Sequence, residues 1–273
     1  MRIDGKKIFK LAGLAMAVSV LFVSTSCDKE PVGNRPVLPP VESLKMDYSD
    51  FNAAIGDKKA SVASYVNFNH AFASLVFWSG VSAASTALPV AAYGYALEQE
   101  AEYLGDNSWE WSYDFEWNQV NYTATLTATR ISNEEFSVEM LIGLAVMPGE
   151  GVRWFDGVVR YDHTHASWTI YREGDIEKLD IEWTCDFEQD DASLQYTYVE
   201  PDMNETGSFI LYEYASQELY DASFSVSLSS GSTLIEWDTT SKEGRVQDET
   251  KFGDALWHCW DSLENGLADK SCE

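Results

Sequence analysis

A strict alternation of aromatic and polar residues runs through Trp109-Glu-Trp-Ser-Tyr-Asp-Phe-Glu-Trp117. Every odd-numbered position is aromatic, and every even-numbered position is Glu, Ser or Asp. Successive side chains of a β-strand point to opposite faces, so one face of this strand is buried and the other is wet. The alternation therefore predicts an antiparallel sheet that is covered on one side only.

Similar runs recur along the rest of the chain and are separated by turn residues such as Ser132-Asn133 and Ser230-Gly231. They lie at 121–130, 135–144, 152–161, 166–171, 179–187, 193–199, 208–214, 222–228 and 233–239. About ten short strands at this close spacing predict an antiparallel meander, a sandwich or an open barrel.

One strand pattern is repeated: Glu110-Trp-Ser-Tyr-Asp-Phe-Glu116 matches Glu182-Trp-Thr-Cys-Asp-Phe-Glu188. The spacing of the repeats is too irregular to predict a propeller, and both duplication and convergence remain open. The match places Cys185 at the position of Tyr113, on the apolar face. We therefore expect Cys185 to be a buried free thiol that is inert as a nucleophile.

The chain has no charged residue between Lys59 and Glu98, and its apolar residues recur there at roughly helical spacing. Pro89 interrupts the pattern. We expect two helices, near 64–86 and 89–104, with Asp106-Asn107 ending the second.

A membrane span is the alternative for the first of these helices, but Asn67, Asn69 and His70 dilute its apolar run. The prediction is an α+β fold in which a helical hairpin packs on a large, mainly antiparallel sheet. Residues 48–105 supply the helical segment and residues 106–273 the β region of one domain.

The N-terminus is basic up to Lys10, then apolar from Leu11 to Val23, and ends in small residues before Cys27. Residues 1–26 are therefore predicted to be a secretory signal peptide. A cysteine at this point resembles the lipobox of bacterial lipoproteins, which implies that the thiol of Cys27 is lipidated. An ordinary signal peptide with an incidental cysteine is the alternative. Residues 27–47 are rich in proline and are predicted to be a tether.

The chain has a formal net charge of −27. Residues 1–26 contain four basic residues and one acidic residue, so the rest of the chain carries 14 basic and 44 acidic side chains. Such a charge excludes binding to nucleic acid or to anionic lipid heads through electrostatics. Contact with the membrane is expected through the lipid on Cys27.

Two small groups of residues are candidate sites. Cys259 and Cys272 lie in a polar C-terminal tail, where a disulfide would hold an end that otherwise frays. His163 and His165 could share one face of a strand and bind a metal, although Asp162-His-Thr-His165 also fits an exposed hairpin tip. The sequence indicates no third ligand and no cofactor.

The C-terminal stretch Phe252-Gly-Asp-Ala-Leu-Trp-His-Cys-Trp-Asp261, together with the lipobox, resembles a group of uncharacterised surface lipoproteins of Bacteroidetes. The resemblance implies an outer-membrane location, on the periplasmic face or the cell surface. We expect a non-catalytic binding or structural protein, whose ligand is a glycan on exposed aromatics or an apolar molecule under the helices. The alternative is an envelope hydrolase that uses paired carboxylates.

Overall fold

A computed structural model describes residues 35–46, 51, 65–147, 149, 151–172, 175–201 and 203–272. The expected signal peptide, Cys27 and the first part of the expected tether lie outside the described residues. Residues 31–273 form one unit, and everything described below belongs to it.

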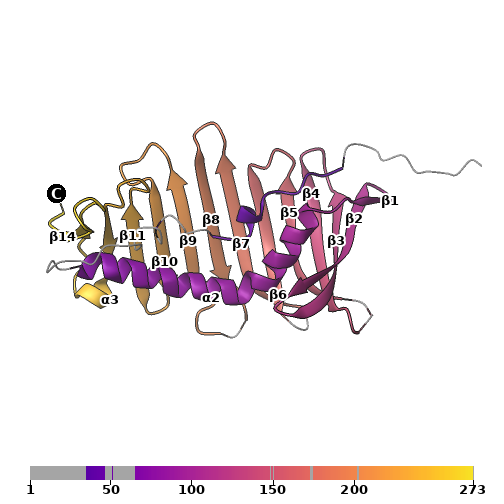
Figure 1. The fold of residues 1–273 in the computed structure, drawn as a ribbon, viewed down its shortest axis with the longest axis horizontal. Coiled ribbons are helices and arrows are strands. Elements are labelled where there is room, and N and C mark those ends of the chain that lie inside the picture. The colour runs from indigo at the N-terminus through magenta and orange to yellow at the C-terminus, as the bar shows by residue number, and fades with distance from the viewer. Residues whose placement is uncertain are drawn as a thin grey trace, which may run out of the picture. The chain divides into compact units, whose positions relative to one another are not determined.

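The unit is built on one antiparallel sheet of fourteen strands, which follow one another in chain order (Figure 1). The strands are β1 (Glu102–Gly105), β2 (Ser108–Trp117), β3 (Val120–Arg130), β4 (Glu135–Leu144), β5 (Val152–Arg160), β6 (His165–Arg172), β7 (Ile176–Asp186), β8 (Asp191–Tyr198), β9 (Phe209–Ala215), β10 (Ala222–Leu228), β11 (Gly231–Trp237), β12 (Gly244–Gln247), β13 (His258–Trp260) and β14 (Asp269–Lys270). The expected α+β class with a large antiparallel sheet is confirmed. The ten expected segments overlap β2 to β11, and four short strands add to them.

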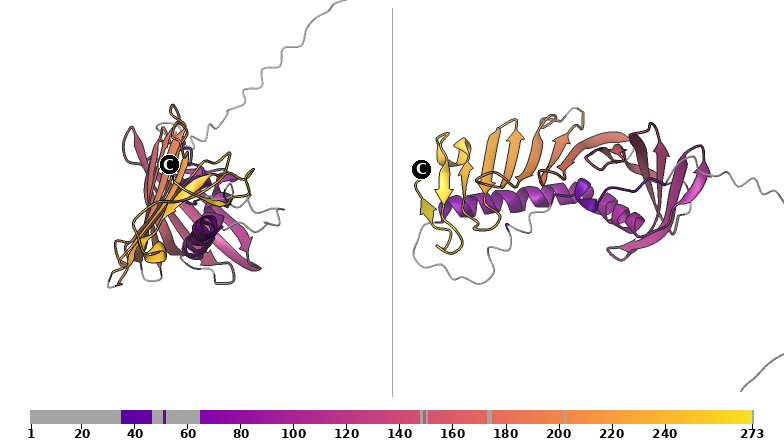
Figure 2. Two further views of the ribbon diagram at one scale, coloured as in Figure 1. Left: turned by 90° about the vertical axis from the view of Figure 1, so that its left-hand side faces the viewer. Right: turned by 90° about the horizontal axis from the view of Figure 1, so that it is seen from above.

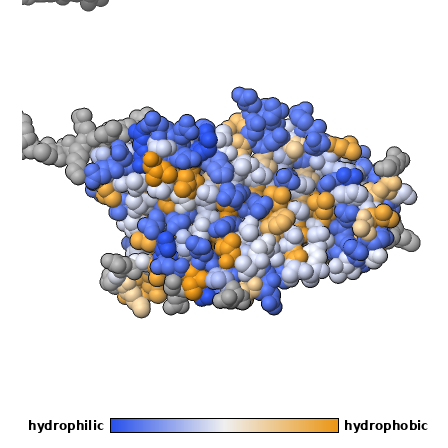
Figure 3. Space-filling view, turned by 180° about the vertical axis from the view of Figure 1, so that it is seen from behind, coloured by the Kyte–Doolittle hydropathy of each residue, from blue (hydrophilic) through white to orange (hydrophobic). Residues whose placement is uncertain are grey.

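The period-two pattern sets the two faces of the sheet. Trp111 of β2 is opposite Leu126 of β3, which in turn is opposite Met140 of β4. All three are at most 2% exposed, so they form a cross-strand row on the buried face. The alternate positions carry polar side chains and form the outer face, which is largely hydrophilic when seen from behind (Figure 3).

The turn at Asp106 and Asn107 corrects one expectation. Both residues have positive φ angles, 53° and 61°, as in a two-residue hairpin turn that matches the twist of the flanking strands. The pair therefore connects β1 to β2 and does not end a helix. Residues 102–105, expected to be helical, form β1 instead.

A single long helix, α2 (Val66–Leu97), replaces the expected hairpin. It continues through Pro89 and bends in its C-terminal part (Figure 1). A proline inside a helix removes one hydrogen bond and crowds the preceding turn, which is unfavourable and bends the helix. Burial of Leu88, Ala92 and Tyr93 against the sheet offsets that cost. Two short elements, η1 (Val41–Ser43) and α3 (Glu249–Phe252), complete the described helices.

The helix crosses one face of the sheet, roughly perpendicular to the strands, and the sheet curves around its C-terminal part at β1 to β5 (Figure 2). Its closest approaches are to β12, β13 and β14 near its start and to β2, β3 and β4 near its end. The helix is thus supported at both ends and spans the middle of the sheet.

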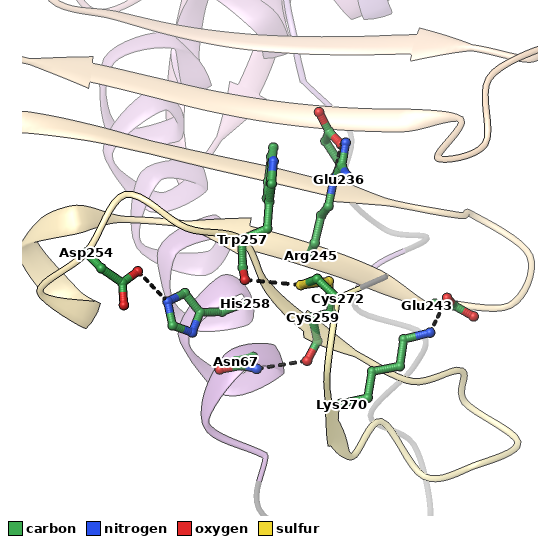
Figure 4. Close-up of a disulfide and its surroundings, with 10 residues drawn as sticks. All are labelled: Asn67, Glu236, Glu243, Arg245, Asp254, Trp257, His258, Cys259, Lys270 and Cys272. Atoms are coloured by element: carbon green, nitrogen blue, oxygen red, sulfur yellow. Dashed lines mark hydrogen bonds and ion pairs between the residues drawn. A yellow bond between two sulfur atoms is a disulfide. The ribbon is translucent and has the colours of Figure 1, made fainter.

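The start of α2 is fixed by the C-terminal strands (Figure 4). The carboxylate of Asp269 accepts hydrogen bonds from the backbone N–H groups of Val66 and Asn67, at 3.1 and 3.0 Å. The Asn67 side chain donates to the carbonyl of Cys259 at 2.8 Å. Cys259 is joined to Cys272, the pair that the sequence predicts, with an S–S distance of 2.05 Å. A bridge over a loop of this size stabilises by about 3 kcal/mol in the chain-entropy account.

The described part of the expected tether, residues 35–46, packs into the same core. Leu44 is fully buried. Its carbonyl accepts a hydrogen bond from the hydroxyl of Tyr196 at 2.8 Å, and the Tyr93 hydroxyl donates to the carbonyl of Pro39 at 2.8 Å. The prolines keep this segment extended, but its leucines give it apolar area to bury, which a tether would not have.

Two inward-facing glycines make room for tryptophans. A Cβ at Gly244 would lie 2.3 Å from Cζ2 of Trp260 and 2.4 Å from the carbonyl oxygen of Glu236. A Cβ at Gly157 would lie 2.5 Å from Cε3 of Trp168. The indole of the neighbouring strand therefore occupies the space in which a side chain would stand.

Gly244→Val should lower the free energy of unfolding by about 3 kcal/mol or more, since overpacking a filled core costs about 1–3 kcal/mol and here the clash includes backbone. The matched control is Gly80→Ala, on the solvent side of α2, where a Cβ meets nothing within 4 Å. That change should stabilise by about 0.5–1 kcal/mol, because alanine favours helix over glycine. Urea unfolding measures both, and equal effects of the two changes would contradict this packing.

Candidate binding groove

A groove of about 440 Å³ lies between the middle of α2 and strands β7 to β10. It is lined by Trp78, Val81, Ser82 and Ser85 of the helix, by Lys178, Leu179, Tyr196, Tyr198, Phe209, Ile210 and Leu228 of the strands, and by Met203, Asn204, Glu205 and Ser208 of the β8–β9 loop. This volume is within the range of small-molecule sites, about 300–1,000 Å³. We call it the α2 groove.

The floor of the α2 groove consists of two adjacent cross-strand rows. Tyr196 of β8 is opposite Ile210 of β9, and Leu179 of β7 is opposite Tyr198 of β8. Each pair points inward, because inward and outward positions alternate along a strand. Leu228, at the end of β10, closes the floor on the far side. The floor is apolar apart from the tyrosine hydroxyls and the side chain of Lys178.

The tyrosine hydroxyls of the floor are engaged away from the groove. The hydroxyl of Tyr196 donates to the carbonyl of Leu44 and accepts from the N–H of Met46. The hydroxyl of Tyr198 donates to a carboxylate oxygen of Glu200 at 2.8 Å. Burial raises the pKa of both hydroxyls, so they stay neutral. They therefore offer the groove ring faces and no charge.

The roof is the part of α2 that does not reach the sheet. Ser82 is nine-tenths buried, and its hydroxyl has no hydrogen-bond partner. A buried polar atom left unpaired costs about 1–3 kcal/mol. Trp78, one turn earlier, packs against the core at the side of the groove. The roof thus combines an aromatic wall with one unsatisfied hydroxyl.

The β8–β9 loop is fixed at the rim by Glu205. Its carboxylate accepts from the hydroxyl of Ser208 at 2.7 Å and from the N–H and hydroxyl of Ser229 at 3.1 and 2.7 Å. These hydrogen bonds lower the pKa of Glu205, and the one from Ser208 has the largest effect. The rim therefore carries a carboxylate that is ionised at neutral pH.

The two histidines expected as metal ligands do not converge. His163 lies in a turn with a φ of 55°, and its Nε2 lies 2.8 Å from the carbonyl of Val37. The Nε2 of His165 lies 3.4 Å from a carboxylate oxygen of Glu182. Within the described ranges, no three His, Cys, Asp or Glu side chains come together to hold a metal ion. This geometry matches the alternative interpretation, in which Asp162-His-Thr-His165 is the tip of a hairpin.

Within the described ranges, the one acid with a raised pKa lies away from the α2 groove. Among the described acids, Glu182 is the one whose pKa is raised. Burial is the main cause and the charge of Asp180 raises the pKa further, whereas the charge of His165 lowers it. Glu182 lies on the outer face and does not line the α2 groove. The buried acid Asp248 contacts His70 at 2.8 Å and also accepts from Thr233. Burial alone would raise the pKa of Asp248. The hydrogen bonds that its carboxylate accepts, the strongest from the backbone N–H of Lys251, outweigh burial and lower the pKa.

The remaining cysteines and aromatics have structural roles. Cys185 is half-buried at the end of β7, less covered than expected, and burial and two nearby aspartates raise its pKa. Cys259 is in a disulfide, which removes it as a nucleophile beside His258. Of the ten tryptophans, six are at most 6% exposed: Trp109, Trp111, Trp168, Trp183, Trp237 and Trp260. These six tryptophans thus fill the core.

A second hollow, of about 610 Å³, lies on the outer face at β7 to β12. Two of its acidic side chains have partners: Glu236 contacts Arg245 at 2.6 Å, and Asp221 accepts from Thr239. The guanidinium of Arg245 stacks on the ring of Trp257 at 4.1 Å. This hollow is more polar than the α2 groove.

By length and composition α2 is apolar enough to cross a membrane. In its most apolar stretch of 18 residues, 28% of the residues are buried inside the protein. Core helices of soluble proteins pass the same test. In this structure the helix packs on the sheet and is hydrogen-bonded to it at both ends.

Comparisons with family models, with curated proteins and with solved structures found no match.

An apolar site under the helices was one of the two expectations, but the residues that line the α2 groove could not be identified from the sequence. Its walls come from residues about 100 positions apart, and Ser82 and Ser85 look like serines that merely dilute an apolar helix. The one available signal was the uncharged stretch itself, which predicts that a helix covers apolar surface.

Proposed function

We propose that the chain is a lipid-anchored protein of the bacterial outer envelope that binds an apolar molecule without catalysing a reaction. The observation that carries this proposal is the α2 groove, whose walls are apolar and whose roof holds an unpaired hydroxyl. Pockets of this kind, with few polar groups among apolar and aromatic walls, are typical small-molecule sites.

The location part of the proposal rests on the N-terminal sequence. A basic start, an apolar run and Cys27 are the features of a lipoprotein signal, and acylation would hold a chain that is too acidic to adsorb on anionic lipids. The cell surface and the periplasmic face both fit. The hydrolase alternative is not favoured, because the raised-pKa carboxyl of Glu182 lies outside the groove.

Binding of N-phenyl-1-naphthylamine, an uncharged dye that fluoresces in apolar surroundings, tests the function. We expect saturable binding to the full chain. Val81→Trp should weaken it about tenfold, because the indole enters the groove mouth. Val76→Trp is the matched control, since Val76 is on the same helix with a similar exposure, 47% against 43%, and does not line the groove. Equal weakening by both changes, or no saturable binding, would contradict the proposal.

Cys27→Ala should move the protein from the membrane to the soluble fraction, because the acyl chains are attached at this one residue. Cys185→Ala is the control and should leave the protein with the membrane. Fractionation in high salt measures both. Retention of the Cys27→Ala protein on membranes would show that α2 or another segment, and not a lipid, is the anchor.

A further inference from the structure

One side of α2 is left uncovered by the sheet. Phe77 is 60% exposed, and Val76, Gly80 and Ala84 near it are exposed as well. Residues spaced by three or four positions lie on the same side of a helix, so these four residues form one stripe. We call it the α2 outer stripe. No Asp, Glu, Lys or Arg occurs anywhere in α2, so the stripe is apolar and uncharged.

The α2 outer stripe can touch a membrane, but α2 cannot cross one while the protein is folded. The opposite side of the helix is buried at Leu75 and Leu88, and its first N–H groups are held by Asp269. Contact is therefore limited to the exposed side. A helix in this position suits the membrane interface, where an apolar face enters the boundary of the acyl chains by about 5–10 Å.

The chain before the described residues leads away from the same side of the sheet. Residues 35–46 lie on the side that α2 covers, and the carbonyl of Pro39 accepts a hydrogen bond from the hydroxyl of Tyr93 in α2 (Figure 1). Arg35 is eight residues after Cys27, and eight extended residues span at most about 28 Å. A lipid on Cys27 would therefore keep the α2 side of the molecule close to the membrane.

The charge distribution favours the same orientation. Asp114 of β2 and Glu182 of β7 are exposed at outward positions of the sheet, and the chain as a whole has a net charge of −27. Acidic side chains are repelled by anionic lipid heads and lose hydration when they enter a membrane. The α2 outer stripe has neither cost, because it carries no charge.

From these observations we infer that the α2 outer stripe rests on the lipid bilayer in which Cys27 is anchored, with the acidic outer face of the sheet turned away from it. The partner is thus a lipid surface, which the stripe contacts through apolar side chains. The inference rests on the proposed lipid anchor and adds to it the surface that the anchored protein presents to the membrane.

The test measures how close two positions of the full, lipidated chain lie to the acyl chains of phosphatidylcholine vesicles. A nitrobenzoxadiazole dye is attached at Gly80→Cys, where a Cβ meets nothing within 4 Å, in a chain that also carries Cys185→Ala. Ser112→Cys, at an exposed outward position of β2, is the matched control. Lipids with a nitroxide on the acyl chain should quench the dye at position 80 about fivefold more than the dye at position 112, because an interfacial helix enters the acyl-chain boundary.

A charged variant tests the stripe itself. Phe77→Asp should lower the quenching at position 80 by about half or more, because a carboxylate is costly to place in a membrane. Leu219→Asp is the control, since Leu219 is an exposed apolar residue of the β9–β10 loop, far from the stripe in the sequence, and borders the hollow on the outer face. It should leave the quenching unchanged.

The outcomes separate the orientation from the anchor. Vesicle-bound protein with equal quenching at the two positions, or with none at position 80, would overturn the inference while the anchor stood. Dye emission at position 80 that rises with protein concentration without vesicles would show that a second copy covers the stripe, and would also overturn it. Loss of the lipidated chain from the vesicles in high salt would remove the proposed anchor itself.

Discussion

The fold depends on covering the apolar face of one open sheet. Fourteen strands present a continuous row of Trp, Phe, Leu and Met side chains on the same side, and this face has no second sheet against it within the described ranges. A sheet in water is stable only when such a face is packed, and here α2, together with residues 35–46, provides the packing. Because each fully buried side chain of this size contributes about 1.5–3 kcal/mol, the contacts at the two ends of α2 are a large part of the stability of the unit.

The groove follows from the same arrangement. A bent helix supported at its two ends cannot also follow the floor of a twisted sheet, so it stands away from the strands between its supports. The outer face is acidic and hydrophilic, whereas α2 carries no charged side chain along its length. Asp248 and Asp269 contact the start of α2, whereas its middle covers a mostly apolar space. The hydroxyl of Ser82 in that space is unpaired, which is unusual in a packed core and is consistent with an exchangeable occupant.

Sequence reasoning predicted the regular parts of the fold and missed the parts set by distant contacts. The alternation in 109–117 correctly indicated a two-faced strand, and the polar tail around Cys259 indicated a disulfide that the structure contains. Pro89 was expected to separate two helices, but one helix continues through it. Burial of the neighbouring residues against the sheet outweighs the intrinsic cost of proline in a helix. The strands β12 to β14 have four, three and two residues, too short to show a period. The residues that line the α2 groove were beyond prediction, since they depend on which strands lie beneath Ser82.

The most direct test removes the cover. A chain without residues 65–100 retains every strand of the sheet but exposes its inner face. The account predicts that this protein aggregates, or binds apolar dye strongly without a cooperative unfolding transition, when it is compared with the full chain by urea unfolding followed by tryptophan fluorescence. Soluble, cooperative unfolding of the shortened chain, with the stability of the full chain, would contradict the claim that α2 holds the sheet.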